Sequence, residues 1–156
     1  MKSGSRLLPL LAAALLSGCG LMDIFQSLYP KSDLARLRIV AEADANQTMA
    51  TALDLVFIYD KTLIPLLPKS GPEWFAKKKS IVANQPGNYV VVSLEVPPGM
   101  VVDAPLPKRS GQALGVFLFA NYLGKEGQFP VNLSTFSSAE IRLKANSIEY
   151  AAAANP

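Results

Sequence analysis

The sequence contains no histidine and only one cysteine, Cys19, among its 156 residues. Without histidine, the usual Ser/His and Cys/His catalytic pairs cannot form, and a zinc site would lack its most common ligands. The carboxylates are dispersed along the chain, and their order singles out no pair of the kind that glycoside hydrolysis requires. We therefore expect a protein that is not an enzyme and that has no catalytic residue, no metal site and no small-molecule substrate.

The chain also lacks an apolar run long enough to span a bilayer. Its N-terminal run, residues 7–16, holds about 10 residues, whereas a transmembrane helix needs roughly 20. Lys2 and Arg6 precede this run and small residues follow it, an order that is typical of a secretory signal peptide. The sequence thus predicts an export signal over residues 1–18, with cleavage between Gly18 and Cys19.

The end of the predicted signal, Leu16-Ser17-Gly18-Cys19, resembles the lipobox of bacterial lipoproteins. In that motif the cysteine becomes the first residue of the mature protein and is acylated. Because no second cysteine exists to form a disulfide, a lipidated Cys19 is favoured over a free thiol in an oxidising compartment. We expect the covalent lipid on Cys19 to be the only cofactor-like group. The lipoprotein resemblance also implies the outer membrane, since Gly20 rather than Asp follows the cysteine.

Charge gives no sign of a nucleic-acid partner. The whole chain has 15 Lys and Arg against 12 Asp and Glu, and removal of the signal takes away two of the positive charges. The mature chain is then nearly neutral. The lysine run at 77–79 has no aromatic platform beside it, so it is typical of a solvated face rather than of a nucleic-acid contact.

A tether is expected at residues 19–33, between the lipid and the first strand. Leu21, Phe25 and Leu28 recur at near-helical spacing and Pro30 follows them. Two interpretations remain open, a short amphipathic helix on the membrane and a disordered spacer. Beyond the tether we expect a single domain at 34–150 and a frayed tail at 151–156.

Short β-branched and aromatic runs separated by turn residues predict a mainly β protein, built as a two-sheet β-sandwich. Strands are expected at 34–41, 52–60, 87–99 and 112–122, with a short edge strand at 100–106 and two strands within 139–150 that break near Asn146. In the first strand Leu37 and Ile39 alternate with Arg36 and Arg38, as in a strand with one exposed face. Asp54 is expected at the solvent edge of its strand or near an end.

Residues 63–87 depart from this pattern and predict a short helical insertion. Ser70 has the character of an N-cap, with Pro72 in the first turn and Glu73 behind it. We expect this helix to pack Trp74 or Phe75 over one edge of the sandwich. At 123–128, by contrast, two glycines surround Lys125 and Glu126, which favours a hairpin turn over a phosphate-binding loop.

Several short motifs together resemble one family. They are the lipobox and tether, Leu37-Arg38-Ile39, Asn46, Val56-Phe57-Ile58-Tyr59, the Trp74-Phe75 insertion, and Leu114-Gly115-Val116 with Ala120 and Tyr122. Over residues 19 to about 150 the chain resembles the outer-membrane lipoprotein of the type VI secretion system, the TssJ family. It departs from that family at Asn46-Gln47-Thr48, where Asn-Pro-Asp is common, and at Gln128-Phe129-Pro130, where a tryptophan is often found.

The resemblance implies a transthyretin-like sandwich, anchored on the periplasmic face of the outer membrane through acyl-Cys19. It further implies that the loop between the first two strands, residues 42–50, binds the periplasmic region of the large inner-membrane subunit TssM. The expected partner-binding residues are Glu42, Asp44, Asn46, Gln47, Thr48 and Met49. From the residues alone, a plain connecting loop is an equally good interpretation.

A second function stays open beside the first. A free-standing periplasmic binding lipoprotein, such as a pilotin-like chaperone or an inhibitor, would carry the same lipobox and the same β domain without any link to type VI secretion. Two interpretations also remain for the proline-rich segment at 97–111, a second contact surface and a stiff loop.

Overall fold

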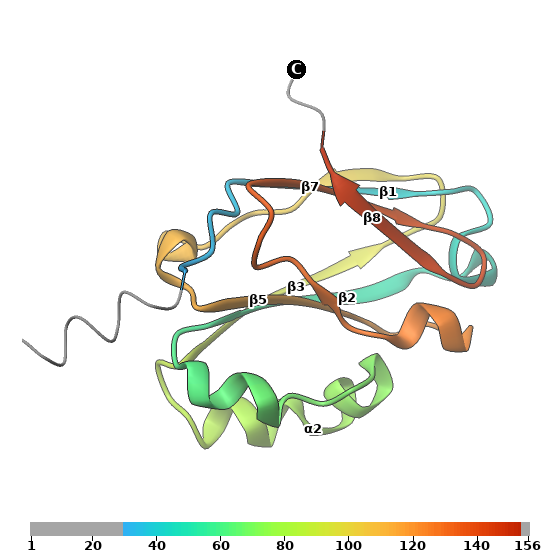
Figure 1. Cartoon of the computed structure of the whole chain (residues 1–156). Coiled ribbons are helices and arrows are strands. Elements are labelled where there is room, and N and C mark those ends of the chain that lie inside the picture. The colour runs from blue at the N-terminus through green and yellow to red at the C-terminus, as the bar shows by residue number, and fades with distance from the viewer. Residues whose placement is uncertain (1–29, 154–156) are drawn as a thin grey trace, which may run out of the picture.

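Two four-stranded sheets lie face to face in the computed structural model, which describes residues 30–153 (Figure 1). The first sheet contains, in spatial order, β4 (Val101–Asp103), β1 (Arg36–Ala41), β7 (Ser138–Leu143) and β8 (Ile148–Ala152). The second contains β3 (Tyr89–Val96), β2 (Thr51–Ile58), β5 (Gly115–Ala120) and β6 (Val131–Asn132). The predicted two-sheet β-sandwich is therefore confirmed.

The predicted signal peptide, Cys19 and most of the tether lie outside the described residues. The last tether residues pack on the domain, because Ser32 is buried and its N–H donates to the carbonyl of Ala113 at 2.8 Å. At the other end, β8 continues to Ala152, which pairs with Ala139, so the strand enters the segment predicted to fray. Within residues 30–153, no helix is both long and apolar enough to cross a membrane.

β1 lies inside the first sheet and pairs with two strands. It runs parallel to β7, with Arg36 opposite Ser138, and antiparallel to β4. Its Leu37 and Ile39 are buried in the core between the sheets while the two arginines point away from it, as predicted. The predicted edge strand is β4, and the break within 139–150 falls between β7 and β8. The alternation of apolar and charged residues therefore predicted correctly which side of β1 faces the core.

β2 differs from the prediction because both of its faces are buried. Leu53, Leu55 and Phe57 join the core between the sheets, and Val56 and Ile58 join a second apolar cluster on the outer face. Asp54 lies on that outer face with no exposed surface. The prediction that Asp54 lies at a solvent edge or a strand end was wrong, because a helix covers this face of the sheet.

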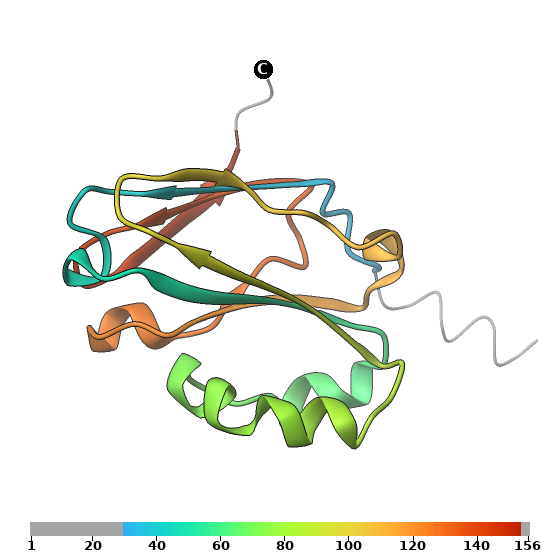
Figure 2. The ribbon, with the colours of Figure 1, turned by 180° about the vertical axis from the view of Figure 1, so that it is seen from behind.

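The covering helix is α2 (Gly71–Ala83), and Figure 2 shows it lying along the outer face of the second sheet. It begins as predicted, with the Ser70 hydroxyl accepting from the N–H of Glu73 at 3.3 Å. Trp74 is fully buried and stacks on Phe119 of β5, with ring centroids 4.8 Å apart. β2 and β5 are the two inner strands of their sheet, so Trp74 packs over the middle of the face and not over an edge.

Candidate functional site

The β1–β2 loop, residues 42–50, crosses from the first sheet to the second. It lies at one end of the sandwich, opposite the end at which residue 30 lies (Figures 1 and 2). The turn between β7 and β8 supports it, because the N–H groups of Asn46 and Gln47 donate to the carbonyls of Lys144 and Ala145 at 2.9 and 3.1 Å. These contacts fix the loop without any regular strand pairing.

Three consecutive residues of this loop have left-handed backbone conformations. The φ angles are 48° at Asn46, 54° at Gln47 and 67° at Thr48. Asparagine tolerates this region, whereas it is strained for a β-branched residue such as Thr48. Strain of this kind costs about 1–3 kcal/mol per residue and persists only where surrounding contacts enforce it, a situation that is common at binding sites. The backbone therefore marks the loop as a site candidate independently of its sequence.

Asn46 has its side chain inside the protein. It is 2% exposed, its Oδ1 accepts from the N–H of Leu123 at 2.8 Å, and its Nδ2 donates to the carbonyl of Asn121 at 3.5 Å. A buried amide is stable only when it is hydrogen-bonded in this way. This position differs from the expectation that Asn46 faces a partner, because the segment after β5 covers it. Its role is to fasten the loop to that segment.

The other residues expected to bind a partner lie at the surface to different degrees. Glu42 is half-buried, with an oxygen 4.0 Å from Arg142 Nη1. Asp44, Gln47, Thr48 and Met49 are exposed and form what we call the loop tip. Gln47 also donates to Asn146 Oδ1 at 3.0 Å. Met49, at 58% exposed, is the large apolar side chain of the tip.

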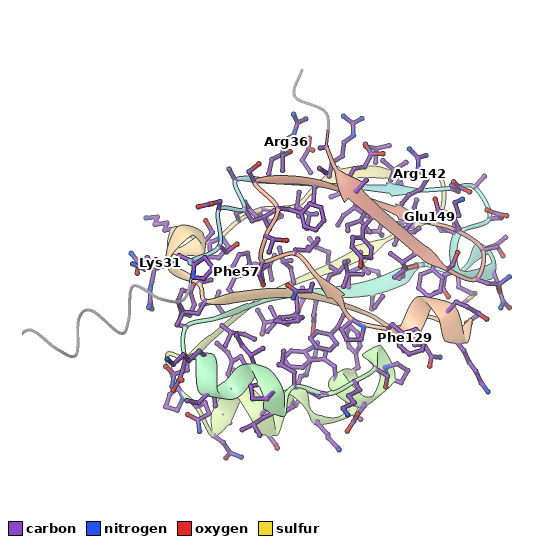
Figure 3. The ribbon with its side chains drawn as sticks, in the orientation of Figure 1. Lys31, Arg36, Phe57, Phe129, Arg142 and Glu149 are labelled. Carbon is purple, nitrogen blue, oxygen red and sulfur yellow. The ribbon has the colours of Figure 1, made fainter. Side chains whose placement is uncertain are left out.

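Two exposed apolar residues that sequence analysis missed lie at the same end of the sandwich. Both belong to the connection between β5 and β6, and Leu123 is 59% exposed and Phe129 68% exposed. Leu123 lies beside the loop through its hydrogen bond to Asn46, and Figure 3 shows Phe129 toward the same end. Met49 of the loop tip lies at this end as well. Large apolar side chains gathered at one end of a soluble domain are typical of an interaction surface. Loops have no burial periodicity, so only the exposed aromatic within Gln128-Phe129-Pro130 offered a signal.

Tyr122 holds the β5–β6 connection in place. Its hydroxyl donates to the carbonyl of Lys144, and its own carbonyl accepts from Gln128 Nε2 at 2.9 Å. Burial raises the pKa of Tyr122 above its ordinary value, so the hydroxyl stays protonated and able to donate even at a more alkaline pH. The connection contains a 3₁₀ turn at Lys125–Gln128, not the simple hairpin turn expected, and Gly127 packs against the tyrosine ring. Phe129 is thus presented from a well-fixed turn.

Replacing Asn46 by alanine is expected to lower the free energy of unfolding by about 2 kcal/mol. The N–H of Leu123 would lose its acceptor in a part-buried place, and alanine would have to adopt the left-handed conformation. Urea unfolding followed by circular dichroism measures the change. Gln47→Ala is the matched control, since it has a similar φ but loses only an exposed hydrogen bond. Equal losses in the two variants would contradict the fastening role of Asn46.

Among residues 30–153 no group of three or more Cys, Asp or Glu side chains is placed to hold a metal ion. This end of the domain combines a strained, well-braced loop with exposed apolar side chains, among them Met49, Leu123 and Phe129. Such an arrangement suits contact with another macromolecule.

Comparison with known proteins supports the fold. No protein-family model matches the sequence, and no curated protein matches it. Among solved structures, the type VI secretion lipoprotein TssJ1 from Pseudomonas aeruginosa matches with a TM-score of 0.58 and 17% identity, over 78% of this chain and 96% of that chain. A chain in the structure of the type VI secretion protein TssM C-terminal domain from EAEC matches with a TM-score of 0.51 and 14% identity, over 74% of this chain and 98% of that chain. The chain thus has the fold of the TssJ1 lipoprotein, as the sequence resemblance predicted.

Proposed function

We propose that this chain is a TssJ-family lipoprotein, anchored in the outer membrane, that fixes a type VI secretion complex by binding the periplasmic region of its large inner-membrane subunit. The observation that carries the proposal is the fold shared with a type VI secretion lipoprotein over 78% of this chain. The lipobox at Cys19 supports it independently, because the fold by itself requires no membrane anchor. The role is positional and needs no chemistry.

The arrangement of the two ends supports this role. The chain from Cys19 enters the domain at residue 30, and the β1–β2 loop lies at the opposite end of the sandwich (Figure 1). The 11 Cα-to-Cα steps from Cys19 to residue 30 span about 36–40 Å when the chain is fully extended. A domain tethered in this way can turn its loop toward the periplasm, where a partner from the inner membrane would approach.

The candidate contact surface combines the loop tip with Leu123 and Phe129. Protein interfaces commonly have an apolar centre with methionine or aromatic side chains, surrounded by a polar rim. Met49, Leu123 and Phe129 would supply the centre, and Asp44 and Gln47 the rim. This surface extends the partner-binding residues beyond the β1–β2 loop to the neighbouring connection.

Affinity purification of the full-length protein from its native envelope, with mass spectrometry of the co-purified proteins, tests the proposal. We expect a large inner-membrane protein with a periplasmic domain to co-purify. Phe129→Asp and Met49→Asp are each expected to lower its recovery roughly tenfold or more, because each places a charge in the apolar centre. Leu66→Asp is the matched control, since Leu66 is 72% exposed on the 3₁₀ turn Lys61–Leu66, which precedes α2.

The same experiment tests the anchor and the alternative function. Cys19→Ser is expected to remove the protein from the outer-membrane fraction, because the acyl chains supply the hold on the membrane. Recovery of the lipoprotein without any type VI secretion subunit would contradict the proposal. That result would favour a free-standing periplasmic binding lipoprotein, such as a pilotin-like chaperone or an inhibitor.

A further inference from the structure

A pocket opens at the end of the sandwich where the described chain begins. Its volume is about 510 Å³, and its lining includes Lys31, Tyr59, Asp60, Lys61, Asn88 and Arg109. It lies where β2 ends and β3 begins, because the N–H of Tyr59 donates to the carbonyl of Asn88 at 2.9 Å. Figure 3 shows Lys31 at this end and Phe129 toward the other. We call it the anchor-end pocket.

Positive charge predominates in the anchor-end pocket. Three cationic side chains line it, and Asp60 is the only carboxylate among the lining residues. Asp60 is engaged locally, because its Oδ1 accepts from the N–H and the hydroxyl of Thr62 at 2.9 and 2.7 Å. Within residues 30–153, no carboxylate forms an ion pair with Lys31 or Arg109. Asp60 also lies close enough to Lys61 to interact with its charge, so the positive charge that remains in excess is that of Lys31 and Arg109.

Tyr59 also lines the pocket. Its hydroxyl is buried and has no hydrogen-bond partner among residues 30–153. Arg109 lies over the ring, with its guanidinium carbon 4.2 Å from the ring centroid. A buried hydroxyl without a partner is uncommon and costly, so an incoming oxygen acceptor would satisfy it. Arginine, lysine and a phenol hydroxyl together are the donors expected around a phosphate group.

We propose that the anchor-end pocket binds the phosphate of an anionic phospholipid headgroup. The inference rests on the lipid anchor in the proposed function, because acyl-Cys19 would hold this end of the domain beside a bilayer. Only ten residues separate Cys19 from Pro30, so headgroups lie within reach of the pocket. A short tether raises the effective concentration of the second contact to roughly millimolar, so even a weak phosphate site is occupied.

The headgroup contact would orient the domain on the membrane. A single lipid anchor does not by itself set the orientation of the domain, whereas a second contact at the same end would turn the β1–β2 loop away from the bilayer. Each basic residue near an anionic surface strengthens binding roughly fivefold. Segment 97–111 runs from the loop end of the sandwich to the pocket end. The N–H of Gly99 donates to the carbonyl of Glu42 beside the loop, and Arg109 lines the pocket.

The test uses the full, acylated protein reconstituted in vesicles, with lysine acetylation followed by mass spectrometry. In vesicles with about one-third phosphatidylglycerol we expect Lys31 to react roughly fivefold more slowly than in pure phosphatidylcholine vesicles. Lys79, on the exposed side of α2, reports general reagent access and is expected to react equally in both. Glycerol phosphate added to the phosphatidylcholine vesicles distinguishes a free anion from a headgroup, and we expect it to protect Lys31 less than phosphatidylglycerol does.

Three variants separate a built pocket from general surface attraction. Arg109→Gln and Tyr59→Phe are expected to abolish most of the protection of Lys31. Lys108→Gln removes the same charge from the neighbouring position, which does not line the pocket, and is expected to preserve the protection. Equal effects of Arg109→Gln and Lys108→Gln on the protection of Lys31 would overturn the proposal that this pocket binds the headgroup.

The outcomes for the pocket and for the anchor are distinguishable. Acylated protein whose Lys31 is equally reactive in both kinds of vesicle would overturn the headgroup site alone. Protection by glycerol phosphate without protection by phosphatidylglycerol would also overturn it, in favour of a soluble anion. Absence of acyl chains on Cys19, read from the intact mass, would overturn the anchor and the headgroup site together. Loss of the secretion partner would leave the vesicle result unchanged.

Discussion

Replacing Asp54 by alanine is expected to lower the free energy of unfolding by about 3–4 kcal/mol, because a buried charge network would lose its centre. Asp54 Oδ2 accepts from Trp74 Nε1 and from Lys78 Nζ, both at 2.8 Å, and Oδ1 accepts from Ser93 Oγ at 2.6 Å. The carboxylate thus joins β2, β3 and α2. Lys78 is 29% exposed and can turn toward water, which holds the expected loss near the lower end of the range for buried ion pairs.

Urea unfolding measures this loss, and the fluorescence of Trp74, the only tryptophan, reports on the contact directly. Asp54→Asn is expected to lose less, because it keeps an acceptor at the same place. Glu95→Ala is the matched control on the adjacent strand, since Glu95 is an exposed carboxylate, and it is expected to change stability by less than about 0.5 kcal/mol. Equal stability of Asp54→Ala and the unaltered protein would refute the structural role of the network.

Replacing Gly71 by alanine is expected to destabilise the protein by about 3 kcal/mol, at the upper end of the usual overpacking cost. A Cβ at this position would lie 1.7 Å from the carbonyl oxygen of Ala120 and 2.7 Å from its carbonyl carbon. These are backbone atoms of β5, which cannot rotate away as a side chain could. The first turn of α2 would have to lift from the sheet and weaken the contact of Trp74 with Phe119.

The loss of stability expected for Gly71→Ala is opposite in sign to the usual effect of this substitution in a helix. In an open helical position, glycine to alanine stabilises a protein by about 0.4–1 kcal/mol, because alanine lowers the entropy of the unfolded chain. Gly111 is the matched control, since nothing lies within 4 Å of a Cβ built there. We expect Gly111→Ala to be neutral or stabilising in the same urea titration. A stabilising Gly71→Ala would contradict the close approach of α2 to β5.

Local patterns in the sequence were sufficient to predict several elements. β1 was predicted because Leu37 and Ile39 alternate with arginines, and one face of that strand is indeed buried. The start of α2 was predicted because Ser70, Pro72 and Glu73 act through contacts within one helical turn. Such signals need no knowledge of the rest of the fold.

Features that depend on distant segments were predicted wrongly or missed. Asp54 was misplaced because its burial is produced by α2, whose Trp74 and Lys78 lie 20 and 24 positions further along the chain. Asn46 was expected outside because nothing near it in sequence reveals that Leu123 would donate to it, 77 positions away. β6 has two residues, too few to show any periodicity. Phe129 was missed as a contact residue because exposure in loops follows no pattern.

The position of β1 has a mechanical consequence. The chain from residue 30 enters this strand at Arg36, and the β1–β2 loop leaves it after Ala41, so a force applied between the N-terminal end and the loop acts along the strand axis. β1 is paired on both sides, with six residues in register with β7 and three with β4. Hydrogen bonds between strands lie across this direction, so they would have to break together in shear rather than one at a time. A pull between the two ends of the domain is therefore borne by a strand that is braced on both sides.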